Sequence, residues 1–351
     1  SLAFISAFFV HPSAAYMGYI DFRVLSLLFS LMLVVAGFQS IGLFHCLGSA
    51  LLTKVHTTRQ LILVLSLLCF FSSMFITNDV ALLTFVPFAI MILTMAGQQK
   101  LLISTIVLQT IGANLGSMFT PVGNPQNLYL ASAFSLSTGT FLIRMFPLTA
   151  LSLVLLVAAA CMLPSTPVDI ASQTAAERPE PKKLAVYLVL FMNCLGCVSH
   201  LIPYPVMLVL VLITLLFINR TLFQKADYFL LLTFVFFFLF IGNVQNIPAV
   251  SDLLHKLIRG RELGAGILLS QCISNVPAAI LLSGFTDQVI SLLYGVNIGG
   301  LGTLIASLAS LISYRFYVGT ENAHTGRYMK VFTLYNVIFL IILALVAWKI
   351  L

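Results

Sequence analysis

Charged residues are scarce in this chain. They make up 8% of its 351 residues, whereas hydrophobic residues make up 60%. A soluble domain carries about 25% charged residues, so the composition excludes a soluble globular protein and predicts an all-α, polytopic membrane protein. A helix needs about 20 apolar residues to cross a bilayer, and the chain supplies roughly nine to eleven such segments. The net charge of +7 comes from basic residues scattered through loops, which suits cytoplasmic loops of an inner (cell) membrane protein and argues against a nucleic-acid partner.

Long hydrophilic runs are also rare. One run, residues 164–183, contains four prolines and is interpreted as a cytoplasmic linker; the N-terminus is placed on the same side. Clusters typical of metal or redox sites are missing as well. Cys194 and Cys197 form a C-x-x-C pair, but no second Cys or His pair completes a site, so we interpret them as small buried hydrophobes and expect no cofactor.

The stretch of residues 112–127, GANLGSMFTPVGNPQN, interrupts this apolar sequence. Pro121 and Pro125 each remove a backbone donor, and the glycines relax the backbone, so a straight helix is excluded. In lipid a broken helix is tolerated only where it faces protein, a water-filled cavity or a bound solute. We therefore predict a broken helix over residues 101–134 that forms half of a solute and ion site.

Residues 60–97 are long enough for two half-helices and carry Thr77-Asn78-Asp79 near their middle. Both ends are basic, which places both on the cytoplasmic side and predicts a re-entrant hairpin with its tip near mid-membrane. An ordinary pair of spans with TND as its turn is the alternative. A second hairpin is predicted over residues 263–286, with Ser274-Asn275 at its tip.

An internal repeat relates the two halves. The pattern Gly-x-Asn-x-Gly-x-x-x-Thr that begins at Gly112 recurs from Gly295, and the tip Thr77-Asn78 recurs as Ser274-Asn275. One span between the two copies has no counterpart, and it reverses the orientation of the second copy in the membrane. We therefore predict an inverted-topology repeat. The predicted divisions are repeat 1 over 1–163, the linker 164–183, the inverting span 184–204, and repeat 2 over 205–351 with a second broken helix over 297–316.

The remaining spans are predicted from apolar runs. Residues 2–10 form a first short span, and residues 24–52 form one long span. Residues 228–254 form another, interrupted at Gly242-Asn243. Arg315 is interpreted as snorkelling to the interface from a span end.

The hairpin tips and helix breaks supply the chemistry of a transport site. Half-helix N-termini offer unpaired amides for an anion, and unwound carbonyls with Asn, Ser and Thr side chains offer neutral oxygens for Na⁺. The predicted binding residues are Thr77, Asn78, Asp79, Asn114, Gly116, Thr120, Asn124, Asn127, Ser274, Asn275, Asn297, Gly299 and Thr303. Two Na⁺ sites are possible within this set, one at Thr77, Asn78, Asn114 and Gly116 and one at Ser274, Asn275, Asn297 and Gly299.

Asp79 breaks the symmetry, because Val276 is its counterpart. A carboxylate in mid-membrane suggests a role in binding a cation or carrying a proton. The alternative is that Asp79 caps the tip by accepting local amides. For the Asn-Gly clusters the alternative is close helix packing by small residues, which explains glycine but not the repeated asparagine.

These motifs resemble the ion transporter superfamily, which includes citrate-transporter-like proteins, arsenite efflux permeases and divalent-anion:sodium symporters. The similar stretches are residues 77–87, 112–127, 270–282 and 306–315. The resemblance implies a scaffold domain, a transport domain carrying two hairpins, and often a homodimer that works by elevator-like displacement. The sodium symporters carry Ser-Asn-Thr at both tips, whereas the tips here are closer to the arsenite and citrate-like branches, which leaves Na⁺ or H⁺ as the coupling ion.

The predicted function is secondary active transport of a small anion, a di- or tricarboxylate such as citrate, through the lipid bilayer. Efflux of arsenite or antimonite is the alternative within transport. An intramembrane enzyme would need a paired set of catalytic residues, such as two facing carboxylates or a His-rich metal site. Asp79 is the one such residue that the sequence places deep in the membrane, so an enzyme is disfavoured. A channel is disfavoured, because symmetric broken helices suit alternating access.

Overall fold

The computed structural model describes residues 6–8, 10, 16–52, 55–168, 179–321 and 323–351. Over these residues the fold is all-α, as predicted, and the sole β feature is an isolated bridge between Thr57 and Pro167. The first predicted span, residues 2–10, lies mostly outside the described residues, as does the middle of the 164–183 linker.

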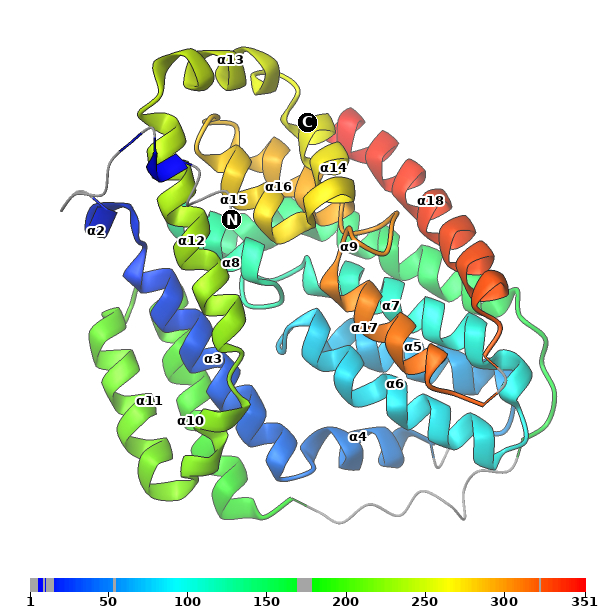
Figure 1. Ribbon diagram of the computed structural model, residues 1–351. Helices are drawn as coiled ribbons and strands as arrows, with labels where there is room; N and C mark the ends of the chain where they lie inside the picture. The colour runs from blue at the N-terminus through cyan, green and yellow to red at the C-terminus, as the bar shows by residue number, and fades with distance from the viewer. Residues whose placement is uncertain (1–5, 9, 11–15, 53–54, 169–178, 322) are drawn as a thin grey trace.

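Helices fill both halves of the chain (Figure 1). The first half contains α2 (Tyr16–Tyr19), α3 (Phe22–Ser40), α4 (Leu43–Leu52), α5 (Thr58–Ser72), α6 (Asn78–Met95), η1 (Gln99–Leu101), α7 (Leu102–Ser117), α8 (Pro125–Ala133) and α9 (Thr138–Cys161). The second half contains α10 (Pro181–Val198), α11 (Tyr204–Ile218), η2 (Arg220–Lys225), α12 (Tyr228–Gln245), α13 (Pro248–Ile258), α14 (Glu262–Ile273), α15 (Asn275–Ser283), α16 (Val289–Ile298), α17 (Leu308–Val318) and α18 (Thr325–Ile350).

Six helices in the described part of the chain are long and apolar enough to cross a membrane: α3, α6, α9, α10, α12 and α18. Five further apolar helices are shorter, from 10 to 17 residues. The apolar sequence is therefore divided into more and shorter pieces than a count of 20-residue segments suggests, because interruptions fall inside several of them. The protein is a multi-pass membrane protein.

The same succession of helices occurs twice. A long helix (α3 or α12) is followed by a short one (α4 or α13), a helical pair (α5–α6 or α14–α15), an interrupted helix (α7–α8 or α16–α17) and a final long helix (α9 or α18). Even the caps match: Asp21 accepts the Val24 amide at 3.0 Å, and Asp227 accepts the Leu230 amide at 2.9 Å. This succession agrees with the repeat seen in the sequence; the inverted topology and the re-entrant hairpins stay predictions.

Three predicted boundaries are wrong. Residues 24–52 do not form one span, because Gly42 takes a left-handed conformation (φ 68°) between α3 and α4. The break predicted at Gly242-Asn243 comes after Gln245 instead, since Gly242 remains helical where the Tyr19 ring packs against it. The second interrupted helix begins at Val289 rather than at residue 297.

Helix α3 packs antiparallel to α10. Near the end of α3, Gly37 lies against the ring of Tyr187, close to where α10 begins. At the opposite end, Arg23 donates to the Cys197 carbonyl at 2.9 Å and to His200 Nδ1 at 2.8 Å. Partial burial and the Arg23 charge lower the pKa of His200, which keeps its imidazole neutral and able to accept.

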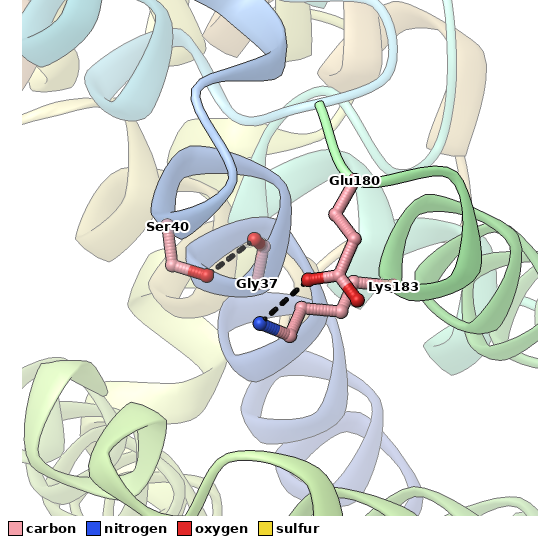
Figure 2. A network of polar contacts seen from close by, with 4 residues as sticks. All are labelled: Gly37, Ser40, Glu180 and Lys183. Atoms are coloured by element: carbon pink, nitrogen blue, oxygen red, sulfur yellow. Dashed lines mark hydrogen bonds and ion pairs between the residues drawn. The ribbon is translucent and has the colours of Figure 1, made fainter. Parts of the chain in front are cut away.

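Figure 2 shows the other end of this pair of helices, where Ser40 bonds the Gly37 carbonyl at 2.7 Å and Lys183 pairs with Glu180 at 2.8 Å. The Lys183–Glu180 pair is half-exposed, so it contributes little to stability. Its position on the first turn of α10 marks a polar end of the helix, as expected beside the linker.

Helices α4 and α13 lie at opposite ends of the molecule, across the direction of α3 and α12 (Figure 1). The start of α5 also lies beside the linker: the Thr58 amide donates to the Thr166 carbonyl at 2.9 Å, and Arg59 Nε donates to the Leu163 carbonyl at 3.0 Å. The start of α5 and the start of the linker therefore share one end of the molecule.

Candidate functional site

The two interrupted helices are joined by their asparagines. Asn297 of α16 donates to Asn127 Oδ1 of α8 at 2.7 Å, and Asn114 of α7 donates to Ser310 Oγ of α17 at 3.4 Å. Asn114 and Asn297 are equivalent positions of the repeat, and so are Asn127 and Ser310. The two contacts are therefore the same contact made twice, and each runs from one half of the chain to the other.

Each hairpin tip is fixed on the loop of its own interrupted helix. The Asn78 amide donates to the Gly123 carbonyl at 3.2 Å, and the Asn275 amide donates to the Ala306 carbonyl at 3.0 Å. The loop threonines support the same junctions: Thr120 donates to the Met74 carbonyl, and Thr303 donates to the Gln271 carbonyl at 3.2 Å. Thr120 and Thr303 therefore fasten the loops to the hairpins.

The first tip also reaches across to the second half. Asn78 Nδ2 donates to Asn114 Oδ1 at 2.9 Å, and Ser307 Oγ donates to the same oxygen at 2.9 Å. Asn78, Asn114 and Ser307 are all buried. One carboxamide thus joins a hairpin tip and both interrupted helices, and the predicted pairing of Asn78 with Asn114 is present.

The second cluster differs from its prediction. Asn297 pairs with Asn127 and with the Leu293 carbonyl, and not with Asn275. Asn275 lies instead beside Gly300 in the second loop. The reason is that α8 packs against α16, which brings Asn127 to Asn297.

The loop between α7 and α8 is held by Ser117. Asn124 donates to Ser117 Oγ, and Asn127 donates to the Ser117 carbonyl at 3.2 Å. Ser117 Oγ in turn donates to the Asn114 carbonyl at 2.9 Å. Asn114, Asn124, Asn127 and Asn297 therefore belong to one continuous buried network.

Gly116 and Gly299 lie in close helix contacts. A Cβ at Gly116 would lie 1.9 Å from the Phe70 carbonyl oxygen of α5, and one at Gly299 would lie 2.7 Å from Ser270 Oγ of α14. The absence of a side chain lets α7 approach α5 and α16 approach α14. Close packing thus accounts for glycine at both positions, and a role of their backbone in ion binding stays a prediction.

A cavity of about 400 Å³ opens at the first hairpin tip, among α3, α6, α8 and α17. Its volume suits a small solute. Thr77 and Asn124 line it, and they are the N-caps of α6 and α8; neither forms a side-chain cap hydrogen bond. Two helix N-termini thus face the cavity, and this geometry favours an anion.

Four charged side chains line the same cavity: Asp79, Asp227, Lys225 and Arg315. None of them forms an ion pair with another described residue. Among the described residues the Asp79 carboxylate accepts no hydrogen bond either, so the capping alternative for Asp79 has no support in the geometry. The sequence predicts that Arg315 snorkels to the interface, whereas in the structure Arg315 lines this cavity.

Comparison with known proteins identifies the family. The family model described as citrate transporter matches residues 1–289. This chain belongs to the citrate transporter family. Among curated relatives, it is 32% identical over 343 residues to the inner membrane protein YbiR of Escherichia coli, with 95% of this chain and 88% of the relative covered. It is 31% identical over 325 residues to an uncharacterized transporter of Methanocaldococcus jannaschii, with 92% and 88% covered.

A shorter similarity links this citrate transporter family member to a plant protein. It is 32% identical over 129 residues to a silicon efflux transporter of Oryza sativa, covering 36% of this chain and 26% of the relative. Taken with the multi-pass fold, the family shows a membrane anion transporter of the citrate transporter type, and not an enzyme.

Ser274 at the second tip of this family member has an unusual backbone. Its φ of 75° and ψ of 156° place a non-glycine residue in a region that is almost exclusive to glycine. Its hydroxyl lies 3.3 Å from Asn275 Oδ1 and 3.4 Å from the Ala306 carbonyl, which it can reach as a donor. Such strain persists only where the surrounding contacts fix it, and it concentrates at functional sites.

Sequence reasoning missed several residues at the site: Ser117, Gln126, Lys225, Asp227, Ser307 and Ser310. A signal existed for two of them, because Ser307 and Ser310 occupy the repeat positions of Asn124 and Asn127. No comparable signal existed for Lys225 and Asp227, since they reach the cavity through the packing of η2 and the start of α12 against α3.

Proposed function

We propose that this protein is a secondary active transporter of a small carboxylate anion, of the size of a di- or tricarboxylate such as citrate. The observation that carries the proposal is the cavity at Thr77, where two helix N-termini face Lys225 and Arg315. Partial positive charges and two cations without ion-pair partners in the described chain complement carboxylates. The helix dipoles and side chains at the cavity hold the solute halfway through the membrane. Alternating access, by an elevator-like movement of the hairpins, carries the solute across. The transporter works as a homodimer.

The coupling ion is Na⁺ or H⁺, and Asp79 is the residue that would respond to it. Its carboxylate faces the cavity without a hydrogen-bond partner in the described part of the chain, so it is available to a proton or a cation. The neutral oxygens at the two tips and breaks, around Asn78 with Asn114 and around Asn275 with Asn297, are the alternative ligands for Na⁺.

Uptake into proteoliposomes tests the function. With an inward Na⁺ or proton gradient, purified protein is expected to accumulate radiolabelled citrate, and one of the two gradients is expected to drive it. Asp79→Asn is expected to remove the dependence on that gradient, while Asp21→Asn serves as the matched control because Asp21 caps α3 and does not line the cavity. An unchanged dependence in Asp79→Asn would remove the coupling role; no uptake of any carboxylate would refute the function.

The orientation follows from the same proposal. Ser165 lies in the linker at the end of the molecule placed in the cytoplasm, whereas Asp252 lies on α13 at the opposite end. Cysteines at these positions, in a background without the exposed Cys161 and Cys272, are expected to react with an impermeant maleimide from opposite sides of the membrane. Labelling of both from one side would contradict the inverted repeat.

Efflux of a neutral metalloid hydroxide, such as arsenite or antimonite, is the second candidate. The cavity carries two acidic and two basic side chains, a balance that also admits an uncharged solute with several hydroxyl groups. The name of the Oryza sativa relative supports a solute of this kind. Loss of arsenite or silicic acid from loaded proteoliposomes, without citrate uptake, would favour this function.

A further inference from the structure

A second cavity, of about 870 Å³, lies where α6 is followed by α7 and where α17 is followed by α18. No described residue lines both this cavity and the one at the first hairpin tip. Gly112 of α7 lies against Ser66 of α5, and one turn later Gly116 lies against Phe70. These two helices therefore run parallel and start at the same end of the molecule. The second cavity thus lies at the linker end, which the sequence places in the cytoplasm.

Two cations from opposite halves of the chain line this second cavity. Lys100 lies in η1, just after the left-handed Gly97 (φ 67°) that terminates α6, and Arg327 lies in the first turn of α18. Neither cation forms an ion pair with another described residue. Glu321 also lines the cavity, so two cations and one carboxylate leave one net positive charge. A cation in the first turn opposes the helix dipole, and a bound anion would offset that cost.

The remaining wall of the second cavity is apolar and reaches the surface of a membrane-spanning helix. Pro87, Ile90 and Met91 of α6 contribute to it, and α6 is long and apolar enough to cross the membrane. Met91 is 46% exposed, and Met95, one turn later, is 50% exposed. An apolar face that no other helix covers marks a surface for acyl chains. Cations at one end of an apolar wall match the phosphate and the chains of a phospholipid.

The polar end of the second cavity is held in a fixed shape. Tyr317 is buried, and its ring stacks on the Tyr328 ring with the centroids 4.8 Å apart. The Tyr317 hydroxyl accepts from the His324 amide at 2.9 Å, and the Tyr317 carbonyl accepts from the Thr320 hydroxyl at 2.7 Å. These contacts tie the end of α17 to the start of α18 and hold Arg327 beside the cavity.

We propose that the second cavity binds the headgroup of an anionic phospholipid, with the phosphate between Lys100 and Arg327. Both side chains bind phosphate oxygens well, and the guanidinium does so with two parallel hydrogen bonds. A phosphodiester carries one negative charge, which matches the net charge of the cavity. The hydroxyls of a glycerol headgroup are donors that the Glu321 carboxylate accepts. Because the two cations come from opposite copies of the repeat, the lipid joins the copies at this end of the molecule.

Binding of a short-chain phosphatidylglycerol to purified protein in neutral detergent tests the inference, with the dissociation constant measured by native mass spectrometry. Wild type is expected to show a saturable site. Each basic residue near a membrane surface contributes about 1 kcal/mol to binding an anionic lipid, which corresponds to about fivefold in affinity. Lys100→Gln and Arg327→Gln are therefore each expected to weaken binding about fivefold, and the double variant about 25-fold.

Lys330→Gln is the matched control. Lys330 lies one turn beyond Arg327 on α18 and does not line the second cavity, so this variant is expected to bind like wild type. An equal loss of affinity in Lys330→Gln would show general attraction to a basic surface and would overturn the assignment to Lys100 and Arg327. Unchanged affinity in the double variant would overturn it as well.

Two further ligands distinguish the source of the phosphate. Phosphatidylcholine has the same phosphodiester with a compensating cation, and it is expected to bind at least about fivefold more weakly. Glycerol 3-phosphate lacks acyl chains and is expected not to displace the lipid. Equal binding of phosphatidylcholine would overturn recognition of charge, and equal binding of glycerol 3-phosphate would overturn the lipid in favour of a soluble phosphate. None of these measurements depends on uptake, so failure of the proposed transport function would leave this inference standing.

Discussion

Asn78→Ala is expected to lower solute uptake about 100-fold while leaving folded protein in the membrane. The Asn78 carboxamide donates to Asn114 Oδ1 in a buried position, and its backbone amide anchors the first hairpin tip on the Gly123 carbonyl. Removal of the side chain takes one of two donors from Asn114 Oδ1, which keeps Ser307, and it takes the acceptor Asn78 Oδ1 from the Asp79 amide at the tip. A buried polar group that loses its partner costs about 1–3 kcal/mol, and the upper end corresponds to about 100-fold.

Initial rates of uptake, normalised to monodisperse protein, measure this effect. Asn275→Ala is expected to behave like Asn78→Ala, because Asn275 is the equivalent tip residue. Asn193→Ala is the matched control: Asn193 of α10 donates to the Met207 carbonyl at 3.3 Å, away from both tips. Wild-type rates in both tip variants would show that the tips are not the site.

Gly116→Ala is expected to give the largest loss of stability, about 3 kcal/mol or more in the free energy of unfolding. The added Cβ would lie 1.9 Å from the Phe70 carbonyl oxygen, which belongs to backbone and cannot rotate away. Helices α5 and α7 would have to separate, and the hairpin and the interrupted helix would lose their contact.

Gly139→Ala is the matched control for this substitution. Gly139 lies near the start of α9 and has no atom within 4 Å of the position of an added Cβ, so its replacement is expected to be neutral or slightly stabilising. Thermal unfolding in detergent compares the two variants. Equal midpoints would show that α5 and α7 do not approach as closely as described.

The sequence was sufficient to predict the interruptions. Proline, glycine and asparagine between residues 112 and 127 cannot continue a helix, and the structure divides the chain there into α7 and α8. The tip residues and the Asn78–Asn114 pair followed from the same local signals and from the repeat. The break at Gly42, by contrast, is not predictable, because a single glycine in an apolar run gives a weak signal until its backbone conformation is known.

Contacts across the halves could not be predicted. The pairing of Asn297 with Asn127 depends on how two interrupted helices cross, and no local pattern in the sequence encodes that crossing. The same holds for Lys225 and Asp227, which come from a segment between helices and reach the cavity through packing. The role of Gly116 was ambiguous for a different reason: glycine serves both close packing and an open backbone, and only the distance to Phe70 distinguishes the two.

The shared carboxamide of Asn114 has a mechanical consequence. Its Oδ1 accepts from Asn78 in the first half and from Ser307 in the second, and Asn297 of the second half donates to Asn127 of the first. The two copies of the repeat are therefore linked in both directions. Under the proposed elevator-like mechanism, we expect the two copies to move together, so that a substitution at this junction in one copy lowers transport although the other copy is intact.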